Sequence, residues 1–297
     1  MNNESLLTKL DKYNNLFISE KRSLNSSNNT ITTYSYILNS FYEFIADEDA
    51  LYELKDITKE ILLKYINKNK DSANSTKILY LAVIKSYSSF IDEKEGLNDL
   101  FTLRLKRVTI KKESVEVDAL NDSEVDKLLS MINKRSSSFN KNRDALLIKL
   151  ILYTGIRASE CLDIKLNDLS LIEDDTVYKI KILGKGSKER FVYIAVDKID
   201  KELEYLKNYI VDYIGITNQK KRMSRVGLYS VISNKMKKAG IDKKGVHILR
   251  HTFARRLVAK NINLVTISEL LGHADITLTA KTYARSNEGN KIAAILN

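Results

Sequence analysis

Apolar residues recur at helical spacing along the first hundred residues of this chain, and no proline interrupts them. Three stripes, at 34–45, 61–66 and 78–91, each place their apolar side chains on one face of a helix. Polar residues that can cap a helix precede them: Thr30 before the first, Asp56 or Thr58 before the second, and Asn74 before the third. Residues 1–106 are therefore predicted to form a small helical bundle.

The rest of the chain is also predicted to be mainly helical, with one exception. Residues 176–182 and 190–194 alternate apolar and polar side chains as strands do, and Gly184-Lys185-Gly186-Ser187 can turn the chain between them. Residues 143–166 have a helical pattern that is interrupted at Thr154-Gly155, and residues 200–297 are helical again. The predicted fold class is mainly α with a small β-sheet, and residues 118–297 form the second domain.

A basic segment separates the two predicted domains. From Arg104 the helical periodicity stops, and no strong apolar face follows before residue 118. We interpret residues 107–117 as a linker that lies along phosphates; a merely solvated linker is the alternative. The basic side chains concerned are Arg104, Lys106, Arg107, Lys111 and Lys112.

Charge and cysteine content narrow the class of protein. The net charge of +11 favours a polyanionic partner, although a lysine-rich genome could produce the same excess. The single cysteine, Cys161, excludes an internal disulfide and a cysteine-rich zinc site. No segment is apolar enough to span a membrane and the polar start is not a signal peptide, so we expect a cytoplasmic protein.

Several side chains in the second domain could together break a phosphodiester. Guanidinium groups stay charged and can fork two donors onto a phosphate, a tyrosine can be the covalent nucleophile, and a lysine on a turn can protonate the leaving oxygen. Neither a metal nor ATP is needed for this chemistry, so we expect no cofactor. The candidates are Arg157, Lys185, His247, Arg250, His273 and Tyr283.

The residues leave some roles open. Arg157 and Glu160 are three apart and share a helix face, so Glu160 can brace the guanidinium, or the two form only a surface ion pair. Lys188 and Arg190 follow the turn closely and could act in place of Lys185 or bind DNA. His251 is expected to be structural, because it lies on a different face from Arg250.

The order of these motifs resembles the tyrosine recombinase (phage integrase) family. The resemblance implies an N-terminal helical core-binding (SAM-like) domain and a C-terminal catalytic domain. It also implies that Arg157, Lys185, His247, Arg250 and His273 activate the phosphate that Tyr283 attacks. The interval of ten residues between His273 and Tyr283 is one longer than in most Xer-type members and is like that of many integrases of mobile elements.

By this resemblance the chain is a site-specific DNA recombinase that works through a 3′-phosphotyrosyl intermediate. It would bind inverted-repeat half-sites in double-stranded DNA and act as a homotetramer, or as a heterotetramer with a second recombinase. The leading hypothesis for its biological role is Xer-type resolution of chromosome dimers. The alternative is that the chain is an integrase of a plasmid, phage or transposable element. A type IB topoisomerase and a non-catalytic DNA-binding regulator are more remote. The apolar residues Ile292, Ile295 and Leu296 are expected to dock on a neighbouring protomer; folding back onto their own domain is the alternative.

Overall fold

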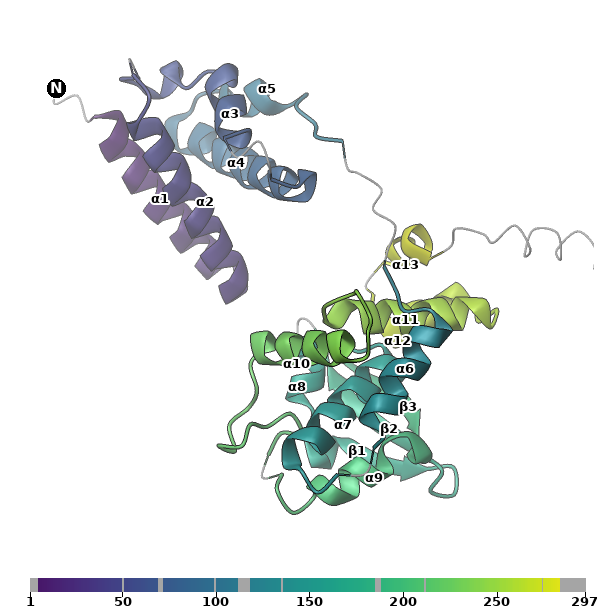
Figure 1. Cartoon of the computed structure of the whole chain (residues 1–297). Coiled ribbons are helices and arrows are strands. Elements are labelled where there is room, and N and C mark those ends of the chain that lie inside the picture. The colour runs from purple at the N-terminus through teal and green to yellow at the C-terminus, as the bar shows by residue number, and fades with distance from the viewer. Residues whose placement is uncertain are drawn as a thin grey trace, which may run out of the picture. The chain divides into compact units, whose positions relative to one another are not determined.

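The computed structural model divides the chain into two compact units, Met1–Val115 and Glu116–Asn297 (Figure 1). It describes residues 5–49, 51–68, 72–98, 100–111, 118–134, 136–184, 188–210, 212–273 and 275–283. Lys112, Lys185 and the tail after Tyr283 lie outside these residues. The helical content and the small sheet confirm the predicted fold class.

The N-terminal unit is a helical bundle, in which α1 and α2 lie side by side (Figure 1). Its helices are α1 (Leu6–Ser23), α2 (Asn28–Ala46), α3 (Lys59–Ile66), α4 (Asn74–Glu95) and α5 (Leu100–Leu105). The hydroxyl of Ser27, rather than Thr30, caps α2, whereas Thr58 caps α3 as predicted. The buried aromatic rings of Phe17, Tyr65 and Tyr87 contribute to the core.

The chain stays packed on this bundle beyond the predicted domain end at residue 106. Arg104 lies on α5 and donates hydrogen bonds to the carbonyls of Lys55, at 2.9 Å, and Ile57. Val108 and Ile110 pack against the bundle core. Arg104 is thus held by the bundle's own carbonyls, and its contact with DNA phosphates stays a prediction. Lys106, Arg107 and Lys111 are exposed.

The second unit surrounds a central helix with further helices and a sheet. Its helices are α6 (Asp122–Ile132), α7 (Phe139–Thr154), α8 (Ala158–Asp163), α9 (Val196–Leu206), α10 (Arg225–Lys238), α11 (Val246–Ala259), α12 (Leu264–Leu271) and α13 (Ile276–Tyr283). Helix α7 is buried on nearly every face, as expected of a helix inside a core, and packs on α9 and α11. Its buried Lys149 pairs with Glu202 on α9, with 2.8 Å between Nζ and Oε1.

The sheet has three antiparallel strands in the order β1-β2-β3. The predicted hairpin corresponds to β2 (Val177–Leu183) and β3 (Glu189–Ala195), which pair with Ile182 opposite Arg190. The amide of Gly184 donates to the carbonyl of Lys188 at 2.8 Å and closes the hairpin. Strand β1 (Leu169–Ile172) was not predicted, because four residues are too few to show a period.

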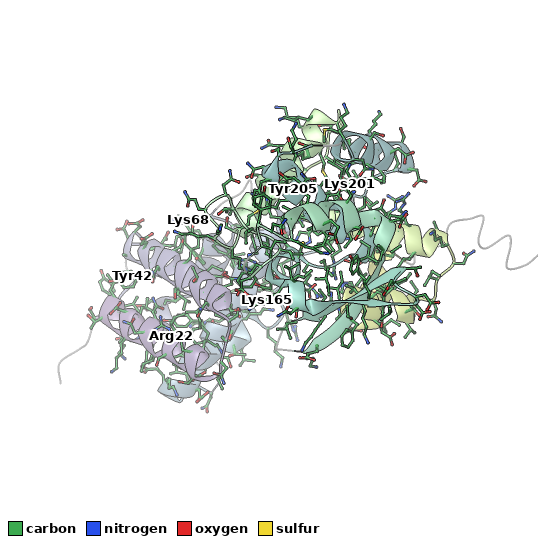
Figure 2. The ribbon with its side chains drawn as sticks, turned by 90° about the horizontal axis from the view of Figure 1, so that it is seen from below. Arg22, Tyr42, Lys68, Lys165, Lys201 and Tyr205 are labelled. Atoms are coloured by element: carbon green, nitrogen blue, oxygen red, sulfur yellow. The ribbon has the colours of Figure 1, made fainter. Side chains whose placement is uncertain are left out.

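The expectation that residues 200–297 are helical throughout is wrong for one segment. Between α9 and α10 the described residues form turns and two isolated bridges, Lys165 with Tyr213 and Ile216 with Arg222. Lys201 and Tyr205 project from α9 (Figure 2) and donate hydrogen bonds to the carbonyls of Asn133 and Ser137. These bonds fasten the connection after α6 to α9.

Among the described residues, no helix combines the length and apolar character that crossing a membrane would require.

Candidate active site

The end of α7 brings Arg157 into position. Gly155 ends the helix with a φ of +67°, a conformation that glycine adopts without strain. A Cβ at this position would lie 2.3 Å from Cδ1 of Phe253, so the close packing also requires glycine. Arg157 then caps α8, and the Gly155 carbonyl accepts a hydrogen bond from Nη1 of Arg250 at 2.6 Å.

The guanidinium groups of Arg157 and Arg250 both donate hydrogen bonds to carbonyls at the C-terminal end of α12. The last carbonyls of a helix have no partner within it and form the negative end of the helix dipole. The Leu271 carbonyl accepts from Nη2 of Arg250 and the Gly272 carbonyl from Nη2 of Arg157, both at 2.8 Å. Gly272 adopts a φ of +64°. The Leu-Gly-His triplet is therefore the place where the two candidate arginines meet.

Glu160 is the buried counterion of this cluster, with only 4% of its side chain exposed. Its carboxylate accepts hydrogen bonds from the backbone amide and Nη1 of Arg157 and from Nη1 and Nη2 of Arg190, at 2.7–2.9 Å. Burial alone would raise the pKa of the Glu160 carboxyl, but the bonds and charges of Arg190 and Arg157 outweigh it and hold the pKa below its usual value. Glu160 is therefore a buried carboxylate shared by two arginines, and not only the acidic partner in a surface ion pair.

Arg190 is the second arginine that contacts this carboxylate. Its two terminal nitrogens bind Glu160, and its Nε donates to the Leu270 carbonyl at 3.3 Å. Its side chain is 14% exposed, and a Cβ on Gly272 would lie 2.8 Å from its Cζ. This guanidinium is thus held by Glu160 and the Leu270 carbonyl, and its contact with DNA stays a prediction. Lys188 is exposed and stays a candidate for binding DNA.

His273 links Arg250 to the last helix. A guanidinium can only donate, so Nε2 of His273 accepts from Nη2 of Arg250 at 2.9 Å. The proton is then on Nδ1, which donates to Oγ1 of the buried Thr279 on α13, at 2.7 Å. Burial and the charges of Arg250, Arg157 and Arg190 lower the pKa of His273 to about 4, so the ring is neutral at pH 7.

His247 and Arg250 lie one turn apart on α11, at its start. Arg250 is 5% exposed, and burial together with Arg157 lowers its pKa to about 10, which leaves it cationic at neutral pH. The His247 ring is at the surface beside these charges. Partial burial of the ring lowers the pKa of His247, and the positive charges of Arg250 and Arg157 lower it further.

Tyr283 ends α13 and is 7% exposed, packed on Ala254, Ile267 and Leu271. Its hydroxyl lies 2.5 Å from Nδ1 of His251. Burial raises the pKa of Tyr283, and the nearby Arg250 only partly offsets this. His251 therefore makes a hydrogen bond within the core, as a structural histidine would, and its partner is the candidate nucleophile. The sequence signal was its place beside Arg250, but its partner lies 32 residues away.

The arrangement gathers Arg157, Arg250 and His273 around the end of α12, with His247 beside them and the Tyr283 hydroxyl on His251. All three histidines of the chain belong to this site. Within the described ranges, no group of three or more His, Cys, Asp or Glu side chains is placed to hold a metal ion. Such a cluster can hold an anion and present a phenol to it.

Comparisons with known proteins agree with this geometry. Residues 118–290 match the model of the phage integrase family. Tyrosine recombinase XerH of Campylobacter jejuni is 30% identical over 292 residues, which cover 92% of this chain and 80% of that protein. Tyrosine recombinase XerC of Leptospira interrogans is 29% identical over 283 residues, 93% of this chain and 88% of that protein.

Solved structures give the same result. The post-cleavage crystal structure of XerH bound to palindromic difH substrate matches with a TM-score of 0.79 and 28% identity, over 92% of this chain and 81% of that one. A lambda integrase dimer bound to a COC′ core site matches with a TM-score of 0.69 at 19% identity and shares the fold.

Proposed function

The chain belongs to the phage integrase family, and we propose that it is a site-specific DNA recombinase of the Xer type. The observation that carries this proposal is the meeting of Arg157 and Arg250 at the end of α12, with Tyr283 tied to the same cluster through His251. The family match, the relatives named Xer and the matching complex of XerH with its DNA substrate support it.

The cation cluster suits a phosphodiester. Arg157 keeps 37% of its side chain exposed although two of its nitrogens are anchored, so it can present the remaining donors to a non-bridging oxygen. Fixed donors aimed at developing charge cost no reorganisation during the reaction, and each contributes on the order of 3 kcal/mol. The anchors on Glu160, Gly155, Leu271 and Gly272 supply that rigidity.

In the proposed cleavage step, the Tyr283 oxygen bonds to phosphorus and the 5′ oxygen leaves with a proton. Lys185 is the proposed donor of that proton; it lies outside the described residues. Energy conserved in the phosphotyrosyl bond then drives rejoining without ATP. His247 is proposed to contact the phosphate together with Arg250.

The test of the nucleophile is Tyr283→Phe on a suicide substrate that is nicked near the scissile phosphate. This variant should bind DNA and form no covalent complex on a denaturing gel. An adduct that survives in the variant would place the nucleophile elsewhere.

The test of the acid is Lys185→Ala. Cleavage of a normal substrate should slow greatly, whereas a substrate with a 5′-bridging sulfur needs no proton and should be cut at close to the parental rate. Equal impairment on both substrates would show that Lys185 only positions DNA.

The biological role is proposed to be resolution of chromosome dimers in the cytoplasm, by a tetramer on paired inverted-repeat sites. The interval of ten residues between His273 and Tyr283 favours one second candidate, an integrase of a mobile element. Mapping bound DNA in cells separates them. Fragments near the replication terminus would support dimer resolution, and a site at the junction of a mobile element would support integration.

A further inference from the structure

The hydroxyl of Tyr283 has one described hydrogen-bond partner, and it is outside the six predicted catalytic residues. Among the described residues this partner is His251, whose Nδ1 lies 2.5 Å from the hydroxyl oxygen of Tyr283. The two rings are 5.8 Å apart between centroids. A second hydrogen bond, from His273 to Thr279, holds helix α13 one turn before Tyr283.

We propose that His251 accepts the proton of Tyr283 when the tyrosine attacks the phosphate. This inference rests on the proposed function, in which Tyr283 is the nucleophile. It adds a base to the reaction, since the cations at the site can stabilise charge but cannot take up a proton.

A base is needed because Tyr283 is a phenol in the assembled site. The ring is buried, and burial disfavours the phenolate, so the proton has to leave as the bond to phosphorus forms. In the tautomer with the proton on Nε2, His251 presents an unprotonated Nδ1 directly to that hydroxyl. Two other histidines belong to the site. Nε2 of His273 already accepts from Arg250, and the ring centroid of His247 is 6.4 Å from that of His251, on the exposed side of α11.

The charges around His251 make its pKa depend on whether DNA is bound. Burial, and then His247 and Arg250 on its own helix and His273 after α12, lower its pKa to about 4, while Asp118 before α6 opposes them. A phosphate that binds Arg250 and His247 would offset these positive charges. The proton affinity of His251 should therefore rise when the DNA is in place.

The step balances within the site. The Tyr283 oxygen forms a bond to phosphorus as its O–H bond breaks, and the proton passes to Nδ1 of His251. The phosphorus–5′ oxygen bond breaks, and the leaving oxygen takes a proton from the acid, for which Lys185 is the candidate. On rejoining, His251 returns its proton to the tyrosine oxygen.

The central experiment compares His251→Asn with the parental protein in single-turnover formation of the covalent complex at neutral pH. Asparagine can accept the hydroxyl's hydrogen bond through its side-chain oxygen but cannot take up the proton. We expect DNA binding to be unchanged and the rate to fall about 100-fold, the usual scale of acid–base catalysis. A rate within a few-fold of the parental one would overturn the proposal.

Two further measurements separate proton transfer from positioning. A fluorinated, more acidic tyrosine at position 283 should restore most of the rate in His251→Asn and change the parental rate little. The parental rate should also fall with acid, through a limb between about pH 4 and 6.5. This parental limb tests the proposal even if His251→Asn does not fold. Loss that fluorination does not relieve, or a parental rate without this limb, would reduce His251 to a positioning residue.

The same experiment distinguishes failure of the proposed function. If the parental protein forms no adduct, or Tyr283→Phe still forms one, then Tyr283 is not the nucleophile and the proposed function fails first. If the parental adduct forms through Tyr283 and His251→Asn is as fast, only the role of His251 is refuted.

Discussion

Glu160→Gln should destabilise the second unit more than any ordinary surface change, because this carboxylate is the shared acceptor for two arginines. The carboxylate accepts four hydrogen bonds, from three nitrogens of guanidinium groups and one backbone amide. The amide of glutamine has one oxygen, which can keep about two of them, and its NH2 group would face donors. Two charge-assisted bonds at about 1.5 kcal/mol each give a loss of about 3 kcal/mol.

That value lies at the low end of the range for breaking a buried ion pair, about 3–5 kcal/mol, as expected because Arg157 is partly exposed. For a unit of this length it corresponds to a fall in Tm of about 6–12 °C, measurable by calorimetry of the full chain. The matched control is Glu204→Gln on α9, whose Lys207 pair is half exposed. The same chemical change there should cost less than about 1 kcal/mol.

The pH dependence gives a second check. Because arginines hold the folded pKa of Glu160 below its ordinary value of 4.5, its stabilisation is complete above that value and is lost as the pH falls through the folded pKa. The difference between the parental protein and Glu160→Gln should be constant from pH 8 to about 5 and shrink below about 4. Equal shifts in Tm for Glu160→Gln and Glu204→Gln at pH 7 would show that the buried carboxylate stabilises the fold no more than a surface ion pair does.

Two other predictions rest on the structure, and a third rests on the sequence of the tail. Gly155→Ala should cost about 3 kcal/mol, because it adds a Cβ 2.3 Å from a phenyl carbon to the strain of a positive φ; Gly240→Ala, with a φ of +71° and open space, should cost about 1 kcal/mol in the same denaturation assay. The folded pKa values of His251 and His273 are lowered to about 4, so folding stability should fall as pH drops from about 6.5 toward 4, and His273→Gln should flatten that slope in pH-dependent melts. Deleting residues 290–297 should leave half-site binding intact and weaken cooperative binding to a full site in gel-shift assays; unchanged cooperativity would remove the proposed role of the tail.

Local signals in the sequence predicted the elements that carry most of the site. Gly155 and Gly272 end helices in a left-handed conformation, so the start of α8 at Arg157 and the end of α12 could be placed from residue types alone. Strand alternation likewise predicted the hairpin, and the helical prediction for residues 200–297 covers α11. The family match confirms the resemblance that the ordered motifs indicated. The roles of the individual residues remain proposals.

The contacts that the sequence could not supply are all between distant elements. Arg190 meets Glu160 across 30 residues, so strand alternation could show that it faces inward but not which charge it meets. Likewise, a helical wheel separates His251 from Arg250 but cannot show that α13 packs against it. The contacts of Arg104 have the same origin, since its carbonyl partners are nearly 50 residues away.

The proposed function requires that Tyr283, among the sixteen tyrosines of the chain, forms the bond to DNA. The most direct measurement is mass spectrometry of the covalent complex trapped on a suicide substrate, after digestion with trypsin and nuclease. We expect a nucleotide adduct on the peptide 282–285, which contains Tyr283 as its single tyrosine. An adduct on any other peptide, or a trapped complex without a modified tyrosine, would contradict it.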